Sequence, residues 1–297
     1  MPPRERVPAL TTPAPGAPDP LDLLSRGELQ VLGRVAGASN TTLVAEVELD
    51  GARARCVYKP VAGEAPLWDF PDGTLAEREL AAWLVSSAGG WDVVPPTVLR
   101  DGPRGAGSVQ LWVGPLLPST PVPGAGLVDV VPPSRVPQGW HAVVEGSGTD
   151  GRSVLLVHAE HPALRRMALF DAVVNNADRK GGHVLRGALR GPGADAAAAG
   201  AGGEEPVWGV DHGLTFHCEH KLRTVLWGWA GQRVDDDGAA RLAATAAALA
   251  GPLADELSDL LTAEEVDALG ERVQRLASRG RYPRPRPGWP TLPWPPF

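Results

Sequence analysis

Lysine and asparagine are rare in this chain of 297 residues. Of its 28 basic residues only three are lysines, which are Lys59, Lys180 and Lys221. Asparagine also occurs three times, as Asn40, Asn175 and Asn176. Because a compact ammonium and a planar guanidinium bind their partners differently, a chain so rich in arginine is expected to keep lysine where arginine would fail. The scarce residues are therefore the first candidates for function.

The sequence also lacks the marks of a secreted or membrane protein. The two cysteines, Cys56 and Cys218, make no disulfide framework and suit a reducing cytosol. No run comes near the roughly 18 apolar residues of a membrane helix, and residues 1–20 contain no apolar signal segment. The net charge of −7 argues against a general nucleic-acid binder. We therefore expect a cytoplasmic protein with no transmembrane segment and no nucleic-acid partner.

Glycine and proline are abundant, with 36 and 31 residues, which indicates many loops. The 43% of hydrophobic residues still suffice for a core. Residues 1–26 are predicted to form a disordered, proline-rich leader. The tail over 281–297 favours extended polyproline conformations. Its two tryptophans could dock on the body or on a partner, or the tail could remain free.

Residues 27–115 are predicted to form an antiparallel sheet with one helix. Strands are expected over 29–34, 42–49, 55–59, 93–99 and 108–113. Asp50-Gly51 is a strong turn signal between the second and third strands. A helix is expected over 74–87, where Thr74 can cap the N-terminus with Glu77 three residues on.

Residues 116–280 are predicted to be mostly helical, so that the fold class is α+β. The expected segments are an irregular linking stretch over 114–139, a helix over 162–175, a low-complexity insertion over 187–204 that forms a mobile hairpin tip, a short strand over 207–211, and helices over 239–250 and 262–278. Thr262 and Glu265 have the spacing of a capping box at the start of the last helix.

Charged residues follow one another in an order that suits phosphoryl transfer. The set is, in chain order, a glycine-containing turn over 33–42, the strand lysine Lys59, a helix glutamate at Glu79 or Glu77, and the loop carboxylates Asp178 and Asp211. Backbone amides of a tight turn can approach phosphate oxygens, and a lysine held by a glutamate neutralises phosphate charge. One aspartate can orient or deprotonate the acceptor hydroxyl while the other binds Mg²⁺.

Four motifs carry these residues. They are Val57-Tyr58-Lys59-Pro60, the segment 79–85, Asn176-Ala177-Asp178-Arg179 and the segment 210–216. In this order they resemble the atypical kinases of the phosphatidylinositol 3- and 4-kinase superfamily, above all its bacterial and type II phosphatidylinositol 4-kinase branch. The stretch 221–230 is similar as well, and the resemblance covers about residues 27–231. It implies a bilobal protein-kinase-like fold with an N-lobe over 27–115 and a C-lobe over 116–280.

The resemblance also implies an ATP-dependent kinase that uses Mg²⁺ or Mn²⁺ and transfers phosphate to an alcohol group. Lys59 would contact the ATP phosphates with Glu79 as its partner. Asp178 would be the catalytic aspartate with Arg179 beside it, and Asp211 would bind the metal. The other implied cofactor positions are Gly37, Ser39 and Asn40 in the phosphate turn and Gln110, Leu111 and Val113 in the interlobe strand beside adenine.

His183 departs from the family pattern, which places a metal-binding asparagine five residues after the catalytic aspartate. Imidazole is a poorer ligand for Mg²⁺ than an amide oxygen, because hard cations prefer oxygen. His183 could therefore bind Mn²⁺, contact a phosphate, or mark a weakened or lost kinase activity. The alternative function is a pseudokinase that serves as a nucleotide-binding scaffold or interaction module.

Plainer interpretations remain open for several residues. Asp178 and Asp211 could cap turns, and Asn175 and Asn176 could simply end the preceding helix. Lys180 could contact substrate or be solvated. A zinc site would use His212, His217, Cys218 and His220, whose spacing fits no established structural zinc pattern. The acceptor is left open between an inositol lipid, another small molecule and a protein, since no basic amphipathic helix marks a membrane surface.

Overall fold

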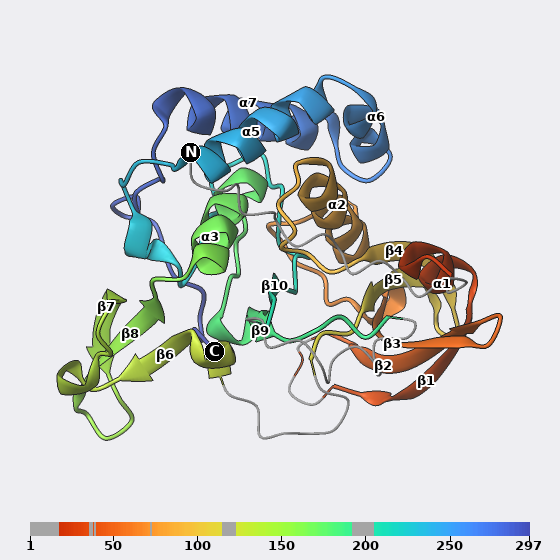
Figure 1. The fold of residues 1–297 in the computed structure, drawn as a ribbon, viewed down its shortest axis with the longest axis horizontal. Coiled ribbons are helices and arrows are strands. Elements are labelled where there is room, and N and C mark those ends of the chain that lie inside the picture. The colour runs from red at the N-terminus through yellow and green to blue at the C-terminus, as the bar shows by residue number, and fades with distance from the viewer. Residues whose placement is uncertain (1–17, 36–37, 39, 72, 115–122, 192–204) are drawn as a thin grey trace, which may run out of the picture.

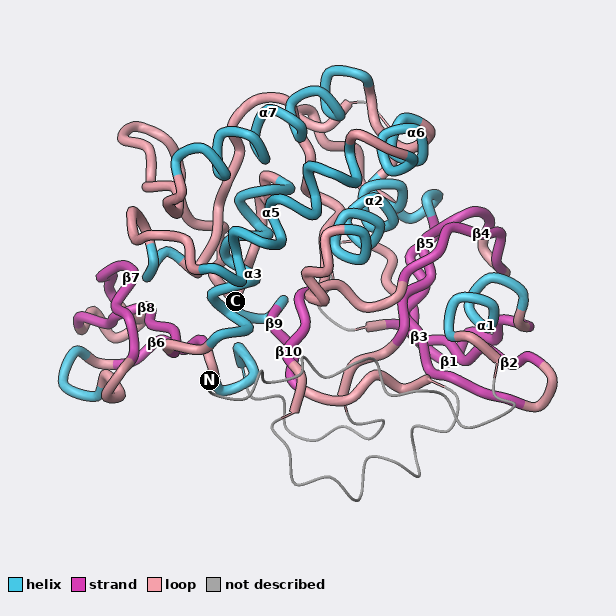
Figure 2. The backbone as a smooth tube through the Cα atoms, turned by 45° about the horizontal axis from the view of Figure 1, so that its top comes forward, coloured by secondary structure: helices cyan, strands magenta, loops and turns pink. Residues whose placement is uncertain are grey.

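The computed structural model describes residues 18–35, 38, 40–71, 73–114, 123–191 and 205–297 of the chain. It is an α+β structure in which both larger sheets are antiparallel (Figure 1). A five-stranded sheet lies at one end of the molecule, a three-stranded sheet lies at the other, and a group of helices lies along one side between them (Figures 1 and 2). The predicted turn residues Gly37 and Ser39 lie outside the described residues.

The five-stranded sheet has the strand order β1-β2-β3-β5-β4. Its strands are β1 (Glu28–Arg34), β2 (Leu43–Leu49), β3 (Ala52–Pro60), β4 (Thr97–Gly102) and β5 (Gly105–Leu111). Asp50 and Gly51 both have positive φ values, 51° and 81°, as a tight two-residue hairpin turn requires. The predicted meander of three strands is thus confirmed, while the strand expected over 93–99 begins only at Thr97.

Helix α1 (Pro20–Arg26) covers one face of this sheet, so the disordered leader predicted over 1–26 is wrong for residues 20–26. Leu23 and Leu24 are both 0% exposed and belong to the core of the sheet. The Arg100 side chain donates hydrogen bonds to the carbonyl oxygens of Leu24 and Gly27, which fixes the end of the helix. A helix of this length is not stable alone, so α1 is stabilised by the burial of its leucines against the sheet. The amino-acid composition of the segment does not reveal this contact. Residues 1–17 lie outside the described part of the chain.

Helix α2 (Leu75–Ala88) begins where the sequence predicts. The Thr74 side chain accepts a hydrogen bond from the Glu77 amide, and the Glu77 carboxylate accepts one from the Thr74 amide, so the capping box is confirmed. Its buried residues Ala81, Ala82 and Val85 join the large core of the helical region rather than the core of the five-stranded sheet. Helix α2 therefore connects the sheet to the remaining helices.

The other described helices are α3 (Pro162–Val174), α5 (Asp236–Leu249), α6 (Pro252–Ser258) and α7 (Ala263–Arg279). The predicted helices over 162–175, 239–250 and 262–278 are confirmed within a few residues, and Thr262 and Glu265 form the predicted capping box. Helix α6 was not predicted. Fully buried side chains such as Met167, Phe170 and Trp229 fill the core of this region.

A three-stranded sheet, in the order β6-β8-β7, corrects the prediction that residues 116–280 are mostly helical. Its strands are β6 (Val128–Val131), β7 (Trp140–Ser147) and β8 (Ser153–Ala159). Strand β6 lies within the stretch predicted to be an irregular link over 114–139. It pairs with β8, which is more than twenty residues away in the sequence, from Val128 opposite His158 to Val131 opposite Leu155. Local composition does not reveal such a pairing.

Strands β9 (Val184–Arg186) and β10 (Val207–Gly209) form a short antiparallel pair in the middle of the molecule (Figure 1). They flank the predicted low-complexity insertion over 187–204, of which residues 192–204 lie outside the described residues. The strand predicted over 207–211 is shorter than expected, because it ends two residues before Asp211. Asp211 therefore lies in the loop that follows a strand.

The C-terminal tail docks on the body of the protein, but not through both tryptophans as one predicted alternative had it, since Trp294 is 88% exposed. The Thr291 carbonyl oxygen accepts hydrogen bonds from the Thr224 amide and from the Trp227 indole. The Gly181 amide donates a 2.8 Å hydrogen bond to the Pro296 carbonyl oxygen. The chain thus ends near β9 (Figures 1 and 2). Across the described residues, no helix combines the length and the apolar character that a membrane span requires.

Candidate functional site

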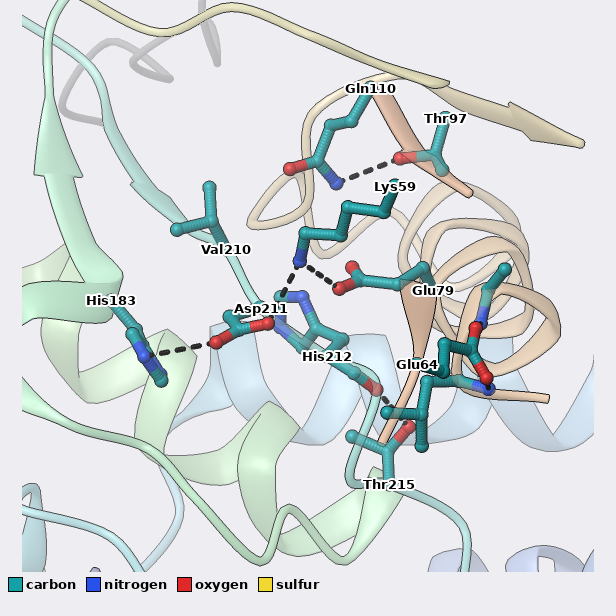
Figure 3. Close-up of polar contacts among 12 residues, drawn as sticks. Lys59, Glu64, Glu79, Thr97, Gln110, His183, Val210, Asp211, His212 and Thr215 are labelled. Carbon is teal, nitrogen blue, oxygen red and sulfur yellow. Dashed lines mark hydrogen bonds and ion pairs between the residues drawn. The ribbon is translucent and has the colours of Figure 1, made fainter. Parts of the chain in front are cut away.

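Lys59 links the five-stranded sheet to two carboxylates from distant parts of the chain. Its Nζ donates hydrogen bonds of 2.5 Å to Glu79 Oε1 and of 2.8 Å to Asp211 Oδ1 (Figure 3). Strand β3 directs the Lys59 side chain to the face of the sheet that also carries Ser108 and Gln110 of β5. Burial lowers the pKa of Lys59, but Asp211 and Glu79 outweigh this and raise its pKa above the ordinary value. Lys59 is therefore a fixed cation.

The structure identifies Glu79 as the partner of Lys59. Glu77 is occupied by the capping box, in which its Oε2 accepts a 2.7 Å hydrogen bond from the Thr74 amide. Two residues along a helix turn the side chain by about 200°, so only one of these glutamates can face the sheet. Glu79 is nearly fully buried, with 4% of its side chain exposed, and this environment holds its carboxylate next to Lys59.

Asp211 accepts partners on both carboxylate oxygens. Its Oδ1 accepts the hydrogen bond from Lys59 Nζ, and its Oδ2 lies 3.1 Å from His183 Nε2 (Figure 3). The backbone of Asp211 is left-handed, with a φ of 61°, and the preceding Val210 amide bonds to the His183 carbonyl oxygen. The Lys59 charge holds the pKa of Asp211 well below its usual range. Half of the Asp211 side chain is exposed, so this anion faces solvent.

Asp178, His183 and Asp211 form a possible metal site. One ligand atom from each residue lies within 4.8 Å of the other two. Burial raises the pKa of Asp178 to about 6, although Lys180, with its Nζ 3.2 Å from Asp178 Oδ2, opposes the shift. Burial also lowers the pKa of His183 to about 4, so the ring is neutral at pH 7 and able to bind a metal. Two carboxylates and an imidazole suit Mn²⁺ better than Mg²⁺.

Arg179 does not point into this cluster. It is fully buried, and its guanidinium donates to both carboxylate oxygens of Asp171 over 2.9–3.1 Å. It also donates to the carbonyl oxygens of His183 and Val210. One guanidinium therefore fixes the backbone beside both loops of the cluster. The structure supports a positioning role for Arg179, where the resemblance implied a catalytic one.

Of the remaining predicted cofactor residues that the structure describes, three lie on or near β5 and Asn40 does not. Gln110 is buried beside Lys59, and its amide donates a 2.8 Å hydrogen bond to Thr97 Oγ1 (Figure 3). The Leu111 side chain lies on the opposite face of the sheet, in the core under α1, and Val113 forms a bridge with Leu189. Asn40 lies elsewhere, where its Oδ1 accepts a hydrogen bond from the Ala65 amide.

The histidines and the cysteine of the zinc hypothesis do not converge. His212 is fully buried and contacts Arg179 Nη2 at 2.7 Å, whereas His217 Nδ1 accepts a hydrogen bond from the Glu219 amide. Within the described ranges, the only converging group of three histidine, cysteine, aspartate or glutamate side chains is Asp178, His183 and Asp211. The zinc hypothesis therefore has no geometric support.

Comparison with known proteins gives one clear relationship. The chain is 49% identical over 278 residues to protein Rv2133c of Mycobacterium tuberculosis strain H37Rv, an alignment that covers 93% of this chain and 94% of that protein. The chain belongs to the Rv2133c family. No family model and no solved structure matches the chain. The name of the relative specifies no reaction, so the argument for function rests on the geometry of the site.

Two residues that shape the site of this Rv2133c family member, Glu64 and Asp171, were not assigned from the sequence, and Asn176 was a candidate without a stated role. Glu64 accepts hydrogen bonds from the first two amides of α2, Leu75 and Ala76, through its two carboxylate oxygens (Figure 3). Asp171 binds Arg179, and Asn176 connects the two, since its Nδ2 donates to Asp171 and its Oδ1 accepts from the Asp178 amide. The scarcity of asparagine pointed to Asn176, whereas nothing local distinguishes Glu64 or Asp171.

Proposed function

We propose that this protein is a divalent-metal-dependent phosphotransferase that uses ATP and has a kinase-like arrangement of two lobes. The observation that carries the proposal is the position of Lys59, which is bonded at once to Glu79 of α2 and to Asp211 beside the Asp178–His183 pair. A lysine paired with a helix glutamate and placed beside a metal-binding aspartate is the arrangement that protein kinases use to transfer phosphate from a nucleotide.

Two separate hydrophobic cores support a division into lobes. One core lies within the five-stranded sheet and α1, and the other joins α2 with the helices that follow. The charged cluster draws on both regions: Lys59 comes from β3, whereas Asp178, His183 and Asp211 come from loops after α3 and β10. We propose that residues 27–115 form the N-lobe and residues 116–280 the C-lobe, with the nucleotide between them.

The proposed chemistry assigns each charged group a role. Lys59 neutralises phosphate charge, and Glu79 keeps its ammonium in place. Asp211 and His183, with Asp178 beside them, would hold a divalent ion, whose contribution is to neutralise the charge of the transferred phosphate. With a pKa of about 6, Asp178 is largely ionised at neutral pH and can still accept a proton from an acceptor hydroxyl. The acceptor is an inositol lipid, another small molecule or a protein.

A second candidate function is nucleotide binding without transfer. Asp211 is engaged on one oxygen by Lys59 and on the other by His183, so a metal must compete with both of these groups. An imidazole in place of an amide oxygen also disfavours Mg²⁺. Such a protein would act as a nucleotide-binding scaffold, as pseudokinases do.

Calorimetric titration with ATP in the presence of Mn²⁺ or Mg²⁺, run beside an assay of ATP consumption, tests both candidates. The transferase predicts saturable binding, with turnover that Asp178→Asn reduces at least about a hundredfold. Asp255→Asn, an exposed residue of α6, is the matched control and should leave turnover unchanged. Binding with no turnover would support the scaffold, and no binding with either metal would exclude both candidates.

A further inference from the structure

A charged cavity lies away from the Lys59–Asp211 cluster. It has a volume of about 640 Å³ and is enclosed by α7, the loop over 218–222 and the first part of the C-terminal tail. This volume is typical of sites for small molecules. Six arginines line it: Arg272, Arg275, Arg279, Arg281, Arg284 and Arg286. None of the residues proposed to bind ATP or metal lines this cavity.

The chain brings these arginines together by two different means. Arg272, Arg275 and Arg279 follow a spacing of three and four residues, which places them along one face of α7. The helix ends at Gly280, whose φ of 55° turns the chain back. The tail then carries its own arginines past α7 to the same cavity, held by the hydrogen bond from Arg281 Nη1 to the Gly231 carbonyl oxygen.

Few negative charges offset this cluster. Glu219 and Glu271 also line the cavity, but Glu219 Oε2 lies 3.6 Å from Lys221 Nζ and is directed to that partner. Among the residues that the structure describes, no carboxylate forms a salt bridge with any of the six arginines. The concentration of positive charge is notable because the chain as a whole has a net charge of −7.

Arg272 is the innermost of these groups and is only partly satisfied. Its Nε donates to the Val173 carbonyl oxygen and its Nη1 to the His217 carbonyl oxygen, while Nη2 is buried with no partner in the described structure. Burial and then Arg275 lower the pKa of Arg272 to about 10. Burial, followed by Arg286, Arg272 and Arg275, lowers the pKa of His220 to about 4. Glu265 and Glu271 oppose the shift of Arg272, but burial and Arg275 outweigh them, and three arginines act on His220 with no carboxylate among its causes.

We propose that this cavity binds a compact anion with clustered phosphate groups, either free in solution or on a phosphorylated lipid headgroup. The planar guanidinium donates two parallel hydrogen bonds to phosphate oxygens, and several arginines around one cavity can bind several phosphates together. The anion would also supply the missing partner of Arg272 Nη2. This site is independent of the function proposed above, because the two share no residue.

Isothermal titration of the full chain with inorganic tripolyphosphate, without divalent metal, tests the proposal. We expect one saturable site in the wild-type protein and in Lys59→Met, which lacks the cation of the ATP site. The double variant R275Q/R279Q should bind at least about tenfold more weakly, since each charge-assisted hydrogen bond contributes that order of affinity. The matched control R135Q/R152Q removes two exposed arginines elsewhere and should bind as the wild type does.

A vesicle arm distinguishes the two sources of the phosphates. Sedimentation with phosphatidylcholine vesicles that carry a bisphosphorylated inositol lipid is compared with phosphatidylserine vesicles of equal charge. Binding of tripolyphosphate without binding to the phosphorylated vesicles identifies a soluble anion, and selective binding to the phosphorylated vesicles identifies a headgroup. If R275Q/R279Q does not fold, R284Q/R286Q tests the tail side of the cavity. The proposal is overturned if neither probe binds, or if R135Q/R152Q loses as much affinity as the cavity variant.

Discussion

The Lys59 ammonium lies 2.8 Å from the Asp211 carboxylate, although 152 positions separate the two residues in the chain. The contact joins a strand of the five-stranded sheet to the loop after β10. Because Asp211 is the larger of the two carboxylate influences on Lys59, and Lys59 is the largest influence on Asp211, each residue stabilises the charged form of the other. The pair is therefore the electrostatic link between the two parts of the proposed site.

Removing the Lys59 ammonium should raise the pKa of Asp211, because Lys59 is the main cause of its depression. In Lys59→Met we expect this pKa to rise toward the ordinary aspartate value, as measured by an NMR titration of the side-chain carboxyl. Since the folded-state pKa of Asp211 is depressed, its stabilising effect is present above about pH 4 and is lost as the pH falls further. Lys180→Met, the matched control, pairs with Asp178 and should leave Asp211 unchanged. A normal pKa for Asp211 in the wild type would contradict the pairing.

Asp178 should destabilise the folded protein at neutral pH. Its pKa is raised from 3.8 to about 6, so the stability that it contributes is full below pH 3.8 and is lost as the pH rises through 6. Asp178→Asn cannot ionise and should raise the free energy of unfolding near pH 8 by at most about 3 kcal/mol. Urea denaturation near pH 8 and near pH 4 measures this, with little change expected at the lower pH. An equal change in the free energy of unfolding at both pH values would show that burial does not raise the pKa of this carboxylate.

His183→Asn should change the metal preference of the site. An amide oxygen replaces the imidazole, so we expect the affinity for Mg²⁺ to rise about tenfold relative to that for Mn²⁺. Titration of each ion, followed by calorimetry or by the electron-spin resonance of Mn²⁺, gives the ratio. His220→Asn lies outside the cluster and serves as the control. An unchanged ratio would mean that residue 183 does not bind the ion.

Helix α1 should be essential to the stability of the five-stranded sheet. Leu24→Ala removes a fully buried side chain from the sheet core, and we expect a loss of about 2–5 kcal/mol in the free energy of unfolding. Ser25→Ala changes an exposed neighbour in the same helix and should have little effect. Chemical denaturation of both variants tests the difference. Equal stability of Leu24→Ala and the wild type would show that α1 is not part of the core.

Elements with local signals could be predicted from the sequence. The capping boxes at Thr74 and Thr262 placed the starts of α2 and α7, and the Asp50-Gly51 turn placed the first hairpin. The set Lys59, Glu79, Asp178 and Asp211 could also be predicted, because residue type, chain order and the surrounding motifs together suggested the chemistry. The structure then brought Lys59, Glu79 and Asp211 into contact and placed Asp178 beside them.

Features that depend on distant partners could not be predicted. Strand β6 needs β8 for its hydrogen bonds, and α1 needs the sheet to bury its leucines. The choice between Glu77 and Glu79 required the direction of each side chain on the helix, because both have the right charge. Arg179 was given a catalytic role from its place beside Asp178, yet the partner that decides its orientation is the buried carboxylate of Asp171.

The bonds of Arg179 also bear on how the site can move. Its guanidinium is shared between Asp171 and the backbone of the two loops that carry His183 and Asp211. Neither loop can swing out alone without leaving part of a buried cation unpaired. For either loop to move away from Arg179, the core around α3 must therefore unfold with it. Amide hydrogen exchange in the two loops is then expected to proceed at one common, slow rate. Because one buried guanidinium holds both loops, the separation of the His183 and Asp211 side chains is fixed by Arg179 and not by the two loops independently.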